Sequence, residues 1–123
     1  MSKIAPLKDF GIPVNAAIPT ANHIIAYYGA HPLDLSNPAA VYESKARIDC
    51  GPISALKAVA DSAGAQVWDL STLSAQLPAG LSGDYDFVFT DMDANGNESD
   101  FSPVVTVTVD TTVPPTLGQP VQL

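Results

Sequence analysis

One short segment carries oxygen-bearing side chains at the spacing with which a calcium loop begins. Asp91, Asp93 and Asn95 alternate along it, and Gly96 follows. Carboxylate and amide oxygens are the ligands that Ca²⁺ prefers, but the EF-hand pattern also needs a bidentate glutamate at position twelve, where this chain has Ser102. If a metal bound here, the oxygen ligands to test would be Asp91, Asp93, Asn95 and Asp100. We favour a hairpin loop, with Asn95-Gly96 supplying the positive φ angles of a tight turn, and predict no metal site.

The residues that usually build zinc or thiol chemistry are too few. His23 and His31 are the only histidines, Cys50 is the only cysteine, and there is no HExxH motif. A zinc site usually takes three or four protein ligands. Cys50 beside a histidine would form a catalytic dyad, but the following Gly-Pro gives no support for one. No intrachain disulfide can form, so we predict that Cys50 is a small, half-buried packing residue.

Two acidic residues and the serines complete the candidates for catalysis. Asp84 and Asp86 share one face of a predicted strand, which would suit a glycosidase only if a cleft surrounded them. A solvated strand face is the simpler interpretation. No serine lies in a GxSxG elbow, and no glycine-rich phosphate loop is present. We therefore predict no enzymatic activity, no catalytic residue and no cofactor.

Three aromatic residues, Tyr27, Tyr28 and Trp68, would suit a sugar-stacking platform. Core packing is the competing interpretation and the one we favour. Adjacent residues of a strand point to opposite faces, so at least one of the two tyrosines could be exposed.

The elements that must position these residues are short strands. The clearest is Gly83–Asp91, where three aromatics share one face; burying each is worth roughly 1.5–3 kcal/mol. These aromatics are Tyr85, Phe87 and Phe89, alternating with Asp84, Asp86 and Val88. Asn22–Ala30 is apolar on both faces, which predicts a central strand covered on both sides. Pro103–Asp110 places its valines on one face and its threonines on the other, and the polar loop 91–101 precedes it.

The remaining segments give weaker patterns. Val41–Asp49 alternates, with Tyr42, Ala46 and Ile48 inward, and predicts a half-buried strand that Gly51-Pro52 ends. Ile53–Ala60 fits strand or helix, with strand slightly favoured. Ala65–Leu73 predicts a strand whose Trp68 and Leu70 face the core, and Pro32–Pro38 predicts a loop.

Length, punctuation and charge bound the architecture. The 123 residues include eight glycines and eleven prolines, which suits one all-β domain of many short strands. We predict an N-terminal arm over 1–11, a β-sandwich over 12–110 and a proline-rich tail over 111–123. The net charge is −8, and no Lys or Arg follows Lys57. Binding to nucleic acid or to anionic membranes needs such cations, so we exclude both. No signal peptide or membrane span is expected.

The second half of the chain resembles bacterial and phage fibronectin type III-like modules of the immunoglobulin-like class. The resemblance covers Leu77–Pro114. It includes Leu77-Pro-Ala-Gly80 and Tyr85–Phe89 as the E–F corner and strand F, Asp93–Ser99 as the F–G turn, and Val104–Val109 as strand G. It implies an antiparallel β-sandwich in which Tyr85 makes a corner hydrogen bond. An immunoglobulin-like variant or a sandwich with an inserted helix remains open for the first half.

These features favour a structural or binding module. The first hypothesis is a phage virion component, such as a capsid decoration (cement) protein, made in the host cytoplasm. Its partner would be the major capsid protein or another virion subunit, with self-association as a further option. The second is a carbohydrate- or cell-surface-binding accessory module of a fibre or secreted protein. Fold-level analogy contributes to the first hypothesis and is a weak warrant.

Overall fold

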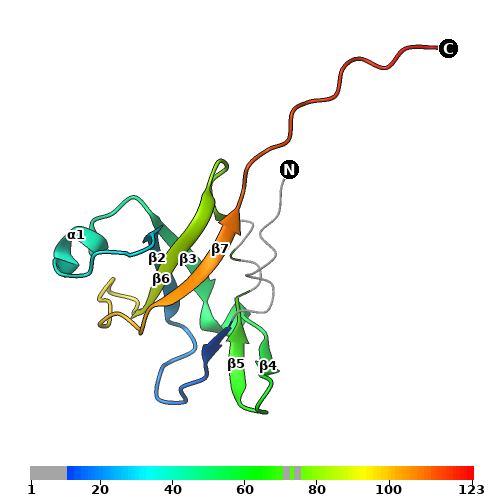
Figure 1. Ribbon diagram of the computed structural model, residues 1–123. Coiled ribbons are helices and arrows are strands. Elements are labelled where there is room, and N and C mark those ends of the chain that lie inside the picture. Colours follow the sequence, from blue (N-terminus) through cyan, green and yellow to red (C-terminus); the bar gives the residue numbers. More distant parts are fainter. Residues whose placement is uncertain (1–10, 71–72, 74–75) are drawn as a thin grey trace.

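The protein is mostly β, with two antiparallel sheets in an arrangement consistent with a β-sandwich (Figure 1). This computed structural model describes residues 11–70, 73 and 76–123. Within them one sheet has the order β1-β5-β4 and the other β3-β2-β6-β7, and each pairing is antiparallel. The strands are β1 Gly11–Pro13, β2 His23–Ala30, β3 Arg47–Pro52, β4 Ala58–Ala60, β5 Gln66–Asp69, β6 Ser82–Met92 and β7 Val105–Asp110.

The predicted central strand is confirmed as β2, which lies between β3 and β6. Its two faces contribute to two separate apolar clusters. Ile24 and Ala26 face the core between the sheets, whereas Ile25 and Tyr27 face the opposite side of the same sheet. A strand buried on both faces lacks polar alternation, as the sequence of β2 shows.

Strands β6 and β7 confirm the predicted alternation. Phe87 and Phe89 belong to the core between the sheets, and Tyr85 packs partly buried against it. Val109 is buried in the same core, and Val105 and Val107 pack against it. The short sheet adds Trp68, from β5, at the margin of the core, and the fully buried Leu70 follows that strand.

The prediction of a strand over Val41–Asp49 is wrong for its first half. Residues 38–42 form the short helix α1 (Pro38–Tyr42), and β3 begins only at Arg47. Pro38 occupies the first turn of the helix, where its missing N–H costs nothing. β3 also continues through Gly51-Pro52, which was predicted to break it. Gly51 takes a φ of 87°, and β3 is an edge strand, where proline is tolerated.

The ambiguous segment Ile53–Ala60 is divided between two elements. Residues Ile53–Ala55 form a 3₁₀ turn, and only Ala58–Ala60 form the strand β4. The predicted strand over Ala65–Leu73 is confirmed over Gln66–Asp69.

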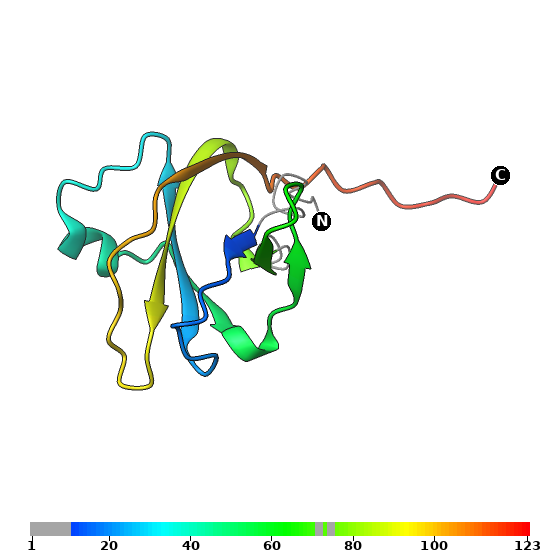
Figure 2. The ribbon, with the colours of Figure 1, turned by 90° about the horizontal axis from the view of Figure 1, so that it is seen from below.

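A second apolar cluster covers the outer face of the four-stranded sheet. Ile25, Tyr27 and Val88 form its base, and Val41 of α1 closes over them. Leu33, Leu35, Tyr42, Met92 and Phe101 pack around it. Figure 2 shows α1 on the side of this sheet opposite to the shorter sheet, so the segment 33–42 forms a third layer. Val41 and Tyr42 do not extend β3 because they pack on this apolar face.

The two predicted ends have different outcomes. The predicted arm 1–11 lies outside the described residues, apart from Gly11, which begins β1. At the other end, Thr111 is buried and ties the end of β7 to Pro78 and Leu81. Residues 112–123 are exposed, form neither helix nor strand, and lead away from the two sheets (Figure 1).

Candidate functional site

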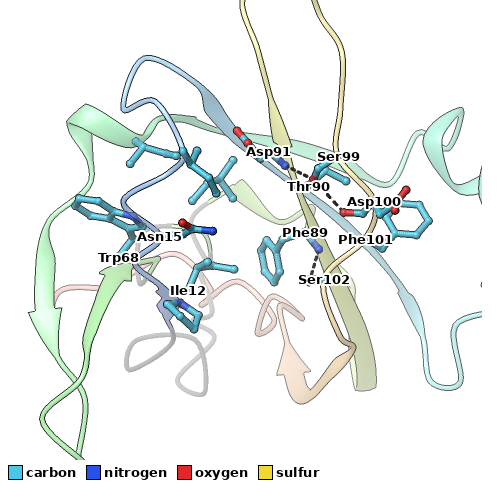
Figure 3. A pocket seen from close by; sticks show the side chains of 14 residues that line it. Ile12, Asn15, Trp68, Phe89, Thr90, Asp91, Ser99, Asp100, Phe101 and Ser102 are labelled. Atoms are coloured by element: carbon cyan, nitrogen blue, oxygen red, sulfur yellow. Dashed lines mark hydrogen bonds between the residues drawn. The ribbon is translucent and has the colours of Figure 1, made fainter.

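A pocket of about 210 Å³ opens between β1 and residues 99–102, on one side of the space between the sheets (Figure 3). Ile12, Asn15 and Trp68 line it on one side, and Phe89, Phe101 and Ser102 line it on the other (Figure 3). Its interior is mainly apolar, and Ile18 and Ile24 add to it. Concave apolar sites with a few polar groups are the usual form of ligand pockets. We take this pocket as the candidate functional site.

Backbone pairing holds Trp68 rigidly at the pocket. It lies on β5, the middle strand of the short sheet, opposite Ile12 of β1 and Ala58 of β4. Its side chain is only partly buried, so part of the indole remains available to a ligand. Pairing on both sides makes this wall of the pocket more rigid than a loop would be.

Two serines fix the opposite wall to β6. The Ser102 backbone N–H donates to the Phe89 carbonyl at 2.8 Å, and its Oγ accepts from the Phe89 N–H at 2.9 Å. Ser99 repeats this arrangement with Asp91, at 2.9 and 3.0 Å. Asn22 Nδ2 also donates to Asp91 Oδ1 at 2.9 Å. The pocket is therefore preorganised to hold an apolar group, with acidic and hydroxyl groups at its rim.

The structure separates the three residues of the predicted sugar platform. Tyr27 is fully buried in the outer cluster, and Tyr28 stacks on Phe87 with ring centroids 5.8 Å apart. Only Trp68 reaches the pocket. Core packing is confirmed for the two tyrosines, because they lie on opposite faces of β2 and both faces are covered.

The loop whose first residues match a calcium-binding loop forms a tight turn, which hydrogen bonds to the Asp93 carboxylate hold together. Asp93 Oδ1 accepts from the backbone N–H groups of Asn95 and Asn97, at 2.9 and 3.0 Å. These bonds lower the pKa of Asp93. Gly96 has a φ of 82°, whereas Asn95 does not take the positive φ predicted for it. Among the described residues, no three His, Cys, Asp or Glu side chains lie together as a metal site would require.

The two histidines lie at opposite ends of β2, and each pairs with a carboxylate. His23 Nδ1 lies 2.9 Å from Asp49 Oδ1, and His31 Nδ1 lies 2.9 Å from Asp86 Oδ1. The Cys50 Sγ instead donates to the Ile48 carbonyl at 3.9 Å. The structure thus places the predicted zinc candidates apart and gives Cys50 the half-buried position expected from the sequence.

We expect the Cys50 thiol to react slowly in the folded protein. Burial, with a smaller contribution from the Asp49 charge, raises its pKa to about 12. Since only the thiolate is nucleophilic, alkylation by iodoacetamide at pH 8 should be more than about a thousandfold slower than for an unperturbed thiol of pKa ~8.5. The rate, followed by mass spectrometry, should rise to that of a free thiol in concentrated urea. Equal rates in the two conditions would contradict this assignment.

The prediction that Asp84 and Asp86 share a solvated face is wrong for Asp86. Asp86 is 3% exposed. It accepts hydrogen bonds from Thr106 Oγ1 at 2.6 Å and from the Leu33 N–H at 3.0 Å, in addition to its contact with His31. Asp84 is exposed and accepts from Thr108 Oγ1 at 2.9 Å. The segment after β2 folds over the sheet and buries one carboxylate but not the other.

Replacing Asp86 by asparagine should destabilise the protein in a pH-dependent way. The Thr106 hydroxyl, then the Leu33 N–H and His31, hold the pKa of Asp86 below its usual value. A depressed carboxyl pKa stabilises the folded state above the unfolded pKa of about 3.9, and this contribution is lost as the pH falls through the folded pKa. The difference in urea midpoint between wild type and Asp86→Asn should be present at pH 7 and should shrink as the pH falls below about 4. Asp84→Asn is the matched control and should change little; a difference that persists undiminished below about pH 4 would refute the assignment.

A polar network behind the pocket was not predicted from the sequence. Glu98 Oε1 accepts from the Tyr27 hydroxyl and from Thr90 Oγ1, each at 2.6 Å. Arg47 Nη2 lies 3.7 Å from Glu98 Oε2, and Arg47 Nε donates to the Tyr27 hydroxyl at 3.2 Å. Burial raises the pKa of Tyr27 to about 12. The network links β2, β3, β6 and the loop after β6, which carries one wall of the pocket.

Comparison with known proteins gives the chain no family. No protein-family model, no curated protein and no solved structure matches it. Within the described ranges, no helix is long and apolar enough to cross a membrane. The resemblance to fibronectin type III-like modules implies a corner hydrogen bond from Tyr85. In the part of the chain that the structure describes, the Tyr85 hydroxyl forms no such bond.

Proposed function

We propose that this protein is a non-enzymatic structural module of a phage virion, a capsid decoration protein that docks on the major capsid protein. One observation carries the proposal: a small two-sheet body ends in an extended segment whose apolar side chains face solvent. Val113, Leu117 and Val121 are 59%, 92% and 79% exposed. A segment outside a folded body can order on a partner and wrap around its surface. Such a segment supports a role in clamping neighbouring subunits.

The strand order supports the immunoglobulin-like part of the proposal. In that class, one sheet contains the neighbours B, E and D, and the other C, F and G. The order β1-β5-β4 corresponds to B-E-D, and β3-β2-β6-β7 corresponds to C′-C-F-G. In this assignment β6 is strand F and β7 is strand G, the same correspondence that the resemblance of residues 77–114 implies.

The charge distribution supports a protein partner rather than nucleic acid or membrane. The chain has a net charge of −8, with all its cations in the first 57 residues. Acidic surfaces repel phosphate groups and favour basic partners. A basic region on a capsid subunit would complement the surface that carries Asp84 and Asp110.

Binding to capsids tests the proposal directly. Full-length protein should co-sediment with particles that lack it and should raise the temperature at which they release their genome. A variant with Val113, Leu117 and Val121 all changed to Asp should bind at least tenfold more weakly. Changing Thr112, Gln119 and Gln122 to Asp adds the same charge to the same segment and should have a smaller effect. Absence of binding to every particle tested would eliminate this function.

A second candidate, a carbohydrate-binding module, is favoured by the pocket. Trp68 supplies an aromatic face, and Asn15, Asp91 and Asp100 supply polar groups around it. Sugars stack on aromatic rings through their C–H faces and hydrogen-bond to amides and carboxylates. Because Trp68 is the only tryptophan, its fluorescence reports on the pocket. A saccharide that shifts this fluorescence in wild type and fails to bind Trp68→Ala would favour the second candidate over the first.

A further inference from the structure

We propose that the pocket beside Trp68 binds the proline-rich segment Val113–Leu117 of a second copy of this chain. The inference rests on the proposed function, in which the extended end docks on a neighbour, and it adds the surface and the segment that meet. Copies would then join head to tail, each giving its tail to the next.

The segment has the properties of a ligand for an aromatic pocket. Val113 and Leu117 flank Pro114-Pro115, and both are largely exposed. Consecutive prolines favour the polyproline II conformation, which is preformed and therefore loses little entropy on binding. Proline-rich segments of this kind dock in grooves lined by aromatic side chains. The segment thus needs a pocket with an exposed aromatic ring and apolar depth.

The pocket supplies both. Trp68 brings a partly exposed aromatic ring, Phe89 brings a second ring that is largely buried, and Ile12 and Ile18 bring aliphatic surface. The Phe101 ring packs on Tyr27 and Tyr42 instead. Its volume of about 210 Å³ exceeds the roughly 150 Å³ of a cavity that accepts benzene. A proline ring or the Leu117 side chain therefore fits. Asp91 at the rim provides carboxylate oxygens for the N–H groups that a polyproline helix leaves unpaired.

Charge favours this segment over the acidic surfaces of a second copy. Nine acids and no Lys or Arg lie between Ala58 and Leu123, yet residues 111–123 contain none of these acids. Two copies at a net charge of −8 repel each other. The uncharged segment can approach Asp91 and Asp100 at the rim without a like-charge contact.

The geometry directs the segment to another copy rather than to its own pocket. Ser102, just before β7, lines the pocket, and β7 then runs to Asp110. Eight residues of extended chain span about 26 Å, and residues 112–123 continue away from the sheets (Figure 1). Return to its own pocket would require a reversal within the stiff Pro114-Pro115 region. A head-to-tail contact needs no reversal and can propagate from copy to copy.

Sedimentation velocity of the full chain tests the contact. Wild type should form dimers and longer species as its concentration rises, and Leu117→Asp should weaken association at least tenfold. Gln119→Asp, with the same charge two residues away, should associate more tightly than Leu117→Asp. A wild type that stays monomeric to millimolar concentration, or a Leu117→Asp variant that associates as wild type does, would overturn the inference.

A peptide titration tests the pocket without altering it. Leu117→Asp protein has no competing tail, and Leu117 is exposed, so this variant should fold normally. A peptide of residues 111–121 should shift Trp68 fluorescence to shorter wavelength, and the same peptide with Leu117→Asp should not. Equal responses to the two peptides would reject the site. Capsid binding is measured separately, so a wild type that binds capsids but does not self-associate would reject this inference alone.

Discussion

Phe87→Ala should lower the free energy of unfolding by about 3–5 kcal/mol, the range for large-to-small changes at a buried phenylalanine. Phe87 is fully buried between the sheets. Its ring centroid lies 5.8 Å from that of Tyr28 and 6.5 Å from that of Phe89. The substitution removes both ring contacts and leaves a cavity that paired strands on each side of β6 cannot close. Urea denaturation followed by far-ultraviolet circular dichroism measures the loss.

Two further variants make this expectation decisive. Phe87→Leu retains most of the apolar volume and should cost less than the alanine change, which keeps the test usable if Phe87→Ala does not fold. Val113→Ala, in the exposed segment, should change stability by less than about 0.5 kcal/mol. A cost below about 1 kcal/mol for Phe87→Ala would show that this ring does not fill the core.

The correctly predicted strands are those in which the pattern of residues along the strand itself indicates which side chains are buried. From Tyr85 to Phe89 in β6, and throughout β7, every second residue is aromatic or valine, and those residues face the core between the sheets. In β2, apolar residues on both faces indicated a central strand, and both faces are covered. A period of two is a property of the segment itself, so it can be read without knowing what lies opposite.

The parts that could not be predicted depend on which segments meet in space. Tyr42, Ala46 and Ile48 alternate with polar residues as a strand would, but Val41 and Tyr42 lie in the helix α1 and pack on the apolar outer face formed by Ile25 and Val88. Asp84 and Asp86 share the strand face opposite the aromatics, which predicted that both are solvated, and nothing local indicated that Leu33 would fold over Asp86. Tertiary contacts overrode local pattern in both cases.

The pocket has no local sequence signal either. Ile12 and Ile18 lie far in the chain from Phe89 and Ser102, and only the fold brings them together. Trp68 was singled out as a candidate sugar platform residue, and it is the member of that set that reaches the pocket. Trp68, a partly exposed aromatic residue on a middle strand, is the one feature of this site that sequence reasoning could have identified.

Glu98→Ala should lower the free energy of unfolding by about 3 kcal/mol. Hydrogen bonds to a charged acceptor contribute roughly 1.5–3 kcal/mol each, and their loss leaves buried donors without a partner. The Glu98 side chain is only 15% exposed. One of its oxygens accepts from Tyr27 and Thr90, and the other lies near Arg47. Removing it leaves the fully buried Tyr27 with Arg47 as its remaining partner. Urea denaturation at pH 7 measures the cost.

Glu98→Ala should also loosen the pocket wall formed by residues 99–102, because Glu98 precedes the two serines that hold this wall. Amide hydrogen exchange in residues 93–102 should speed up in Glu98→Ala more than exchange in β7. Asp100→Ala, at an exposed acid of the same loop, should change neither stability nor exchange by a comparable amount. In a double-mutant cycle, Tyr27→Phe and Glu98→Ala should couple by about 1–2 kcal/mol. Additive effects would mean that the Tyr27–Glu98 bond does not join the loop to the sheet, and the wall would then owe its position to Ser99 and Ser102 alone.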